Sequence, residues 1–153
     1  MRKLLTILVI FLLPMSIFGQ EKNQQKPLPI VKYDDNVNLP LTDKERAQIL
    51  EVFGDSAERL VFNNSNRLKS IKNILRNRVV IDEYPNKDLS YQMNISDIAL
   101  TPEARNEAKS GSLNRDNFNP LKYNFNFDST DGIKHFRIDN TQYLITIMPQ
   151  HAN

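Results

Sequence analysis

The sequence Tyr-Leu-Ile-Thr-Ile-Met at residues 143–148 carries the strongest secondary-structure signal of the chain. Its side chains alternate between the two faces of an extended strand, and apolar residues stand on both faces. Strands with apolar residues on both faces are typically covered by other parts of the protein on both faces. We therefore expect residues 143–148 at the centre of a sheet or beneath a helix.

Two further extended segments precede this one. Aromatic residues alternate with polar ones over residues 123–127, and Phe136 and Ile138 follow the turn-forming residues 128–132. Together with residues 143–148, these segments predict three consecutive antiparallel strands.

A second group of strands is expected in the middle of the chain. The β-branched run 78–84 and the alternating run 89–95 are separated by turn-forming residues at 85–88, which predicts a hairpin. Residues 30–33 are a further candidate for one edge strand.

Two helices are expected before these strands. Thr42 and Glu45 have the spacing of a capping box, and Gly54 can end a helix in the left-handed conformation, so the first helix is predicted over residues 43–53. The second helix has Ser65 as a candidate cap, and the link at 55–64 is expected to be partly helical. Its apolar residues recur at helical spacing: Leu68, Ile71, Ile74 and Leu75. Thr101-Pro102 predicts one or two further helical turns.

These patterns predict an α+β fold in which two main helices pack on one face of an antiparallel sheet of about five strands. The chain has 153 residues, of which 40% are apolar and 25% charged, as expected for one globular domain. It contains no cysteine, which excludes disulfides, thiol catalysis and cysteine-ligated metal sites. No motif indicates a cofactor.

Residues 1–19 resemble an export signal peptide. Basic residues Arg2 and Lys3 precede an apolar stretch at 4–13, and Gly19 provides a small residue at the expected cleavage point. The apolar stretch is about half of the roughly 20 residues that a membrane-spanning helix needs, so a retained anchor is the weaker alternative. We expect a signal peptide at 1–19, an extended polar and proline-containing tether at 20–40, and a single α+β domain at 41–153.

Processing changes the charge of the protein. Loss of Arg2 and Lys3 reduces the 20 basic residues to 18, equal to the 18 acidic ones, so the formal charge falls from +2 to zero. A neutral chain without a long basic run is not expected to bind nucleic acid or an anionic membrane surface. No second apolar run of spanning length follows the first, so stable membrane insertion after signal removal is not expected either. The mature protein is expected in the periplasm or outside the cell.

Three segments resemble a group of small exported proteins of Bacteroidota that have no assigned activity. They are residues 117–123 (NFNPLKY), residues 137–145 (RIDNTQYLI) with Pro149-Gln150, and residues 72–79 (KNILRNRV). This resemblance implies export and a bacterial source, and it implies no catalytic residue.

Candidate catalytic and metal-binding residues are few. His135 and His151 lack the spacing of a metal-ligating pair, and residues 128–132 lack the distal glutamate of a calcium loop. Neighbouring acids at Asp34-Asp35 and Asp82-Glu83 point to opposite faces of a strand, which does not suit a glycosidase pair. We therefore assign no catalytic, cofactor-binding or metal residue.

The aromatic residues Tyr123, Phe125 and Phe127 have two possible roles. They can form a platform for carbohydrate or peptide, with Asn124 and Asn126 on the opposite face, or they can form the core face under the helices. Phenylalanine lacks the polar tip that such platforms use, so the core role is favoured.

The most distinctive surface feature is a basic stripe along the second helix, formed by Arg67, Lys69, Lys72, Arg76 and Arg78. These residues can form a solvated helix face whose long stems cover the core. Alternatively, they can bind an acidic partner or the phosphates of a membrane surface.

Two functions remain open. The favoured one is an exported non-catalytic protein that binds or scaffolds another envelope or extracellular component through an exposed sheet edge or the basic stripe. The alternative is a small extracytoplasmic hydrolase, which needs a cleft built from residues such as His135, Asp82 and Glu83.

Overall fold

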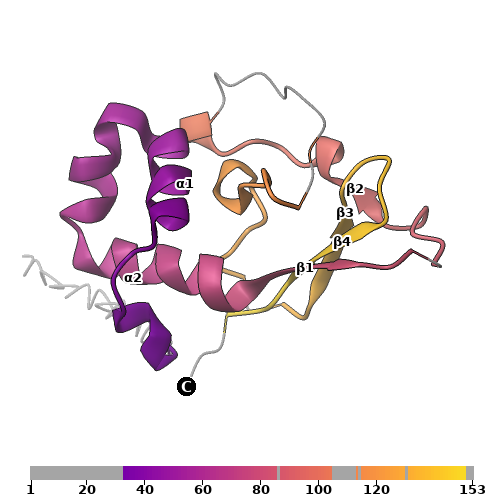
Figure 1. The fold of residues 1–153 in the computed structure, drawn as a ribbon, viewed down its shortest axis with the longest axis horizontal. Coiled ribbons are helices and arrows are strands. Elements are labelled where there is room, and N and C mark those ends of the chain that lie inside the picture. The colour runs from indigo at the N-terminus through magenta and orange to yellow at the C-terminus, as the bar shows by residue number, and fades with distance from the viewer. Residues whose placement is uncertain (1–32, 86, 105–112, 114, 130, 151–153) are drawn as a thin grey trace, which may run out of the picture.

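The computed structural model shows two helices at one end of the molecule and a sheet at the other (Figure 1). The described residues are 33–85, 87–104, 113, 115–129 and 131–150. The expected signal peptide, most of the expected tether and edge strand, and His151 lie outside these ranges. Within them, no helix is both long and apolar enough to cross a membrane.

Helix α1, Asp43–Phe53, has the predicted bounds and the predicted capping box. The Glu45 N–H donates to the Thr42 hydroxyl at 3.2 Å, and the Thr42 N–H donates to the Glu45 carboxylate at 2.8 Å. The helix ends at Gly54, whose φ of 48° lies in the region that favours glycine. Ile49 and Val52 are buried on its inner face.

Helix α2, Ser65–Asn73, follows a link that is helical in short turns at Gly54–Ser56 and Glu58–Phe62, as predicted. Its cap is Asn64 rather than Ser65, because Asn64 is the last residue in extended conformation and its side chain accepts the Arg67 N–H at 3.0 Å. A π-helical turn, Ile74–Arg78, continues α2 directly into the first strand.

The sheet has four strands in the order β1-β4-β3-β2. They are β1 Val79–Glu83, β2 Met93–Asn94, β3 Lys134–Arg137 and β4 Tyr143–Ile147. Strand β4 is central, as its apolar residues predict, and pairs antiparallel with β1 on one side and β3 on the other. Its residues Ile145 and Ile147 are 0% and 3% exposed.

The predicted hairpin of residues 78–84 and 89–95 is wrong. Strands β1 and β2 lie at opposite edges of the sheet, and β2 pairs parallel with β3, so the sheet is mixed rather than antiparallel. After β1, the Lys87 N–H donates to the Tyr84 carbonyl and the Gln92 N–H donates to the Leu89 carbonyl, and Leu89 is buried, so the chain does not reverse tightly into a paired strand. Strand β4 is apolar on both faces, which is typical of a strand with a neighbour on each side. It pairs with β1 at the edge where residues 89–95 were expected to pair.

Residues 123–127 do not form the predicted strand. Tyr123 makes one isolated bridge to Leu100, and Asn126 has a φ of 53°, which an extended strand does not allow. Tyr123 and Phe125 are nevertheless buried, as expected for core residues. The described part of the sheet therefore has four strands rather than the predicted five or so.

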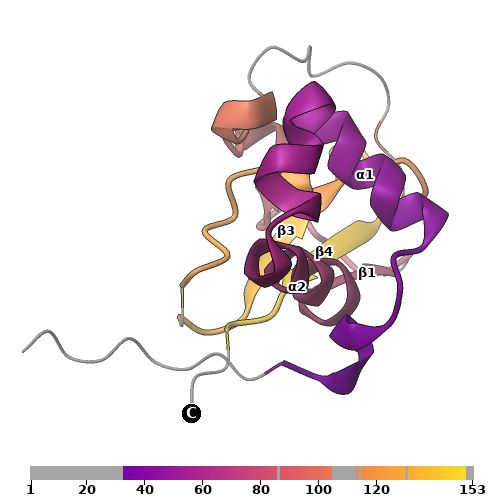
Figure 2. The same ribbon diagram turned by 90° about the vertical axis from the view of Figure 1, so that its left-hand side faces the viewer.

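The core has two parts. One joins α1 and α2 through residues such as Ile49 and Ile71. The other covers the inner face of the sheet with an aromatic cluster that includes Phe118, Tyr123 and Phe125. Seen from the helical end, α1 and α2 lie in front of the strands (Figure 2). The segment that carries the aromatic cluster, rather than the helices, thus supplies the cover over the inner face.

Candidate functional site

Among the described residues, strand β1 lies at the edge of the sheet and has a neighbouring strand on one side only. At its two ends, the Met148 N–H donates to the Arg78 carbonyl at 2.8 Å, and the Tyr84 N–H donates to the Gln142 carbonyl at 2.8 Å. Bonded residues alternate along an antiparallel ladder. The even-numbered residues of β1 therefore bond to β4.

The odd-numbered residues Ile81 and Glu83 direct their N–H and C=O groups to the open side of the sheet. No other part of the described chain bonds to these groups. A row of unpaired backbone donors and acceptors is a template for another strand. The side chains at the same edge include Val80, which is 42% exposed on the outer face.

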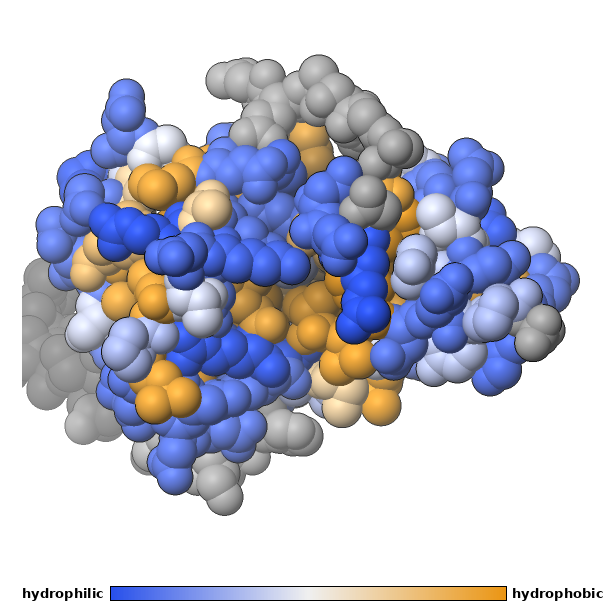
Figure 3. All heavy atoms as spheres, in the orientation of Figure 1, coloured by the Kyte–Doolittle hydropathy of each residue, from blue (hydrophilic) through white to orange (hydrophobic). Residues whose placement is uncertain are grey.

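A recess of about 220 Å³, lined by both apolar and polar side chains, lies beside this edge on the inner face. We call it the edge recess, and it is lined by Thr42, Lys44, Glu45, Gln48, Leu75, Val79, Ile81, Arg115, Phe118 and Pro120. Apolar residues gather in the middle of this face of the molecule, between the helices and the sheet (Figure 3). A strand added to β1 would place alternate side chains over the edge recess.

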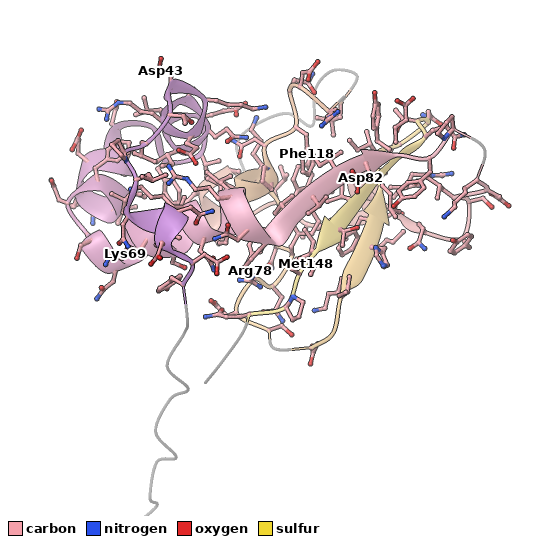
Figure 4. All side chains as sticks on the ribbon, turned by 60° about the horizontal axis from the view of Figure 1, so that its bottom comes forward. Asp43, Lys69, Arg78, Asp82, Phe118 and Met148 are labelled. Atoms are coloured by element: carbon pink, nitrogen blue, oxygen red, sulfur yellow. The ribbon has the colours of Figure 1, made fainter. Side chains whose placement is uncertain are left out.

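Hydrogen bonds to α1 position the floor of the edge recess. The Asn119 amide donates to the Gln48 carbonyl at 2.9 Å and to the Glu51 carboxylate at 2.7 Å. Gln48 in turn donates to the Phe118 carbonyl at 3.3 Å. These contacts hold Phe118 beside the inner face of β1, where it lines the edge recess together with Val79 and Ile81 (Figure 4 labels Phe118 near β1).

Charged residues are unevenly distributed along the edge. Asp82 and Glu83 are exposed at the end of β1, and neither forms an ion pair within the described part of the chain. Lys44 and Arg115 line the edge recess instead. Glu45 lines the recess as well, but it is paired with Arg76, so the edge is acidic along its last residues and the charges around the recess without an ion pair in the described chain are basic.

The basic stripe is not one continuous surface. Lys72 is 7% exposed, and its ammonium donates to the carbonyls of Val37 at 3.2 Å and Leu39 at 2.6 Å. Burial lowers the pKa of Lys72. Lys69 is exposed on the helical side, away from Arg78 at the start of β1 (Figure 4).

Arg76 and Arg78 are also bonded within the chain. Arg76 donates to the Glu45 carboxylate at 2.5 and 2.7 Å and to backbone carbonyls of residues 36–40. Arg78 is 5% exposed, its Nε donates to the Met148 carbonyl at 3.0 Å, and its guanidinium stacks on Phe127. Burial lowers the pKa of Arg78. Of the five predicted partner-binding residues, Lys72, Arg76 and Arg78 thus help to build the fold.

A larger hollow of about 360 Å³ lies between α2 and residues 121–128. Arg67 lines it, pairs with Glu103 at 3.3 Å and stacks on Phe53. Asn124 and Asn126 line it as well. Two of its three charged lining residues, Arg67 and Glu103, are therefore bonded to each other, whereas β1 presents backbone groups that no described residue bonds.

The residues named for a hydrolase do not converge. Asp82 and His135 lie on the outer face of the sheet, separated by β4, and Glu83 lies on the inner face. His135 Nδ1 is 3.1 Å from the Thr146 hydroxyl, and none of the three residues lines the edge recess or the larger hollow. No group of three or more metal-ligating side chains occurs in the described ranges.

Comparison with known proteins adds no assignment. The chain matches no protein-family model, and neither the curated proteins nor the solved structures provided a match.

Sequence reasoning missed the edge recess. It assigned residues 78–84 to a hairpin, which would have covered one side of β1. Phe118 and Arg115 fall in a segment for which the sequence predicts no helix or strand, and only the apolar residues on both faces of β1, Val80 and Ile81, could have signalled an exposed apolar edge.

Proposed function

We propose that this protein is an exported binding module that adds an extended segment of another envelope or extracellular protein to the open edge of β1. The unpaired backbone groups of Ile81 and Glu83 beside the edge recess carry this proposal. Main-chain hydrogen bonds supply affinity in strand addition, and pockets for alternate side chains supply specificity. The edge and the recess provide both.

Export rests on the signal-peptide pattern of residues 1–19. Binding outside the cytoplasm suits a fold without cysteine, because no thiol is present to oxidise there. The basic residues Arg67 and Lys69 remain a second surface for an acidic partner, since Lys69 is exposed.

A proline substitution tests the proposal. Glu83→Pro removes one outward N–H from an edge strand, a position that tolerates proline, and leaves the ladder with β4 intact. The matched control Glu83→Gln keeps this N–H and should weaken binding by at most about fivefold, as loss of one surface charge does.

The measurement uses a displayed library of linear heptapeptides selected on the purified protein. Selected peptides should bind the wild type and Glu83→Gln and lose binding to Glu83→Pro, with folding checked by circular dichroism. Peptide should also slow hydrogen exchange at the Ile81 and Glu83 amides. Peptides that bind Glu83→Pro as well as they bind the wild type would contradict strand addition at β1.

A further inference from the structure

We infer that the segment bound at β1 runs antiparallel to it and carries basic residues at its amino end, followed by apolar side chains at alternate positions. This inference rests on the proposed function and names the chemistry of the partner. Antiparallel pairing is favoured because it is slightly more stable per residue than parallel pairing.

The register follows from the outward groups of Ile81 and Glu83. In an antiparallel pair, the residue opposite Ile81 exchanges both N–H···O=C bonds with it and shares its inner face. That residue and the one opposite Val79 would lie over the edge recess, which Val79 and Ile81 both line. These two positions of the partner therefore suit apolar, β-branched side chains.

Charge sets the order of the remaining positions. Residues opposite Asp82 and Glu83 meet exposed carboxylates without an ion pair in the described chain, so lysine or arginine fits there. Lys44 and Arg115 line the recess, and the acidic residue of its lining, Glu45, is already paired with Arg76, so a basic side chain placed over the recess would be repelled. Read from its amino end, the segment therefore has two basic residues opposite Glu83 and Asp82, and then an apolar residue opposite Ile81. A residue of high strand propensity follows opposite Val80, and a second apolar residue lies opposite Val79.

A second copy of this chain fits less well. If β1 of another copy paired antiparallel about Ile81, a valine would face Glu83 and another would face Asp82, so neither carboxylate would gain a cation. That strand is also flanked by the π-helical turn, which would bring a folded body against this edge. A flexible segment of another protein can bond to the same backbone groups of Ile81 and Glu83 without bringing a folded domain against the edge.

Three labelled peptides test the inference by fluorescence anisotropy: GKKITVG, its retro sequence GVTIKKG, and the charge-reversed GEEITVG. GKKITVG should bind at least about tenfold more tightly than either of the other two. N-methylation of its isoleucine removes the N–H that would donate to Ile81 and should abolish binding. N-methylation of its threonine, whose N–H points away from β1, should not.

A charge-swap variant separates recognition from folding. The double variant Asp82→Lys with Glu83→Lys should prefer GEEITVG over GKKITVG, whereas Asp55→Lys, an exposed substitution on the helical side, should keep the original order. Equal binding of the forward and retro peptides, or an unchanged preference in the double variant, would overturn the inference.

Three further outcomes distinguish the proposed function from the inference about the partner. If library-selected peptides need the Glu83 N–H but GKKITVG does not bind, the inference fails and the proposed function stands. If light scattering shows a dimer that Glu83→Pro dissociates, a second copy occupies the edge and the inference is wrong. If no peptide depends on the Glu83 N–H, both fail.

Discussion

Arg76 joins the amino-terminal segment, α1 and the start of β1 through one guanidinium. It pairs with Glu45, and the two side chains are 13% and 10% exposed. The Arg76 hydrogen bond holds the pKa of the Glu45 carboxyl below its ordinary value, and the same bond raises the pKa of Arg76. The Glu45 carboxylate also closes the capping box of α1, so one buried anion serves two structural contacts.

Replacing Arg76 with alanine should lower the free energy of unfolding by about 3 kcal/mol, because it leaves Glu45 buried without its cation. The measurement is urea unfolding at pH 7. Arg46→Ala is the matched control, since Arg46 and Glu58 are 54% and 65% exposed, and it should cost less than about 1 kcal/mol. The folded-state pKa of Glu45 is depressed, so this stabilisation is present above the ordinary value of 4.5 and is lost as pH falls through the folded-state pKa. Equal effects of Arg76→Ala at pH 7 and at pH 3 would contradict this role.

Strand β4 and strand β1 show how position in the sheet decides the role of an element. Strand β4 bonds to neighbours on both sides, and its inner face is buried against the aromatic cluster. Strand β1 bonds on one side only and leaves an apolar residue, Val80, partly exposed. A central strand therefore contributes stability, while an edge strand remains available for binding.

Truncation in the central strand should be costly. Ile145→Ala should lower the free energy of unfolding by about 2–5 kcal/mol, as burial of a large aliphatic side chain predicts, and Ile147→Ala should fall in the same range. Leu50→Ala is the control, because Leu50 is 43% exposed, and it should cost well below that range. Similar urea midpoints for the wild type and Ile145→Ala would show that β4 is not a core element.

At the scale of the whole molecule, a short amino-terminal segment is part of the fold. Asp35–Asn38 forms a 3-10 turn with Val37 buried, and Lys72 and Arg76 bind the carbonyls of this segment. Asn36 and Asn77 exchange amide hydrogen bonds beside it. The folded domain thus includes residues of the segment that composition alone described as a tether.

Export should leave these contacts intact. We expect a mature chain that begins at Gln20, because Gly19 precedes the first polar stretch and every contact of the 35–38 turn lies beyond it. Intact mass of the protein recovered from outside the cytoplasm measures this start. A mass that includes Met1 would indicate a retained anchor, and recovery only from the cytoplasm would contradict export.

Local signals determined the helical half of the fold. The Thr42–Glu45 box and Gly54 set both ends of α1, since each end depends on hydrogen bonds and backbone freedom within a few residues. The apolar pattern of residues 143–148 likewise determined that β4 is buried and central. The burial of Tyr123 and Phe125 followed from their alternation with polar residues.

Only the tertiary structure decided which strands are neighbours and which charges are free. Pairing β1 with β4 joins residues that are at least 60 positions apart in the sequence, and alternation in either strand does not encode its partner. Lys72, Arg76 and Arg78 have the spacing of a solvated helix face, but carbonyls from distant segments, at Val37, Asn36 and Met148, bind them. The open edge of β1 exists for the same reason: the residues that precede and follow it in the sequence pack elsewhere, and no described residue bonds to the outward backbone groups of Ile81 and Glu83.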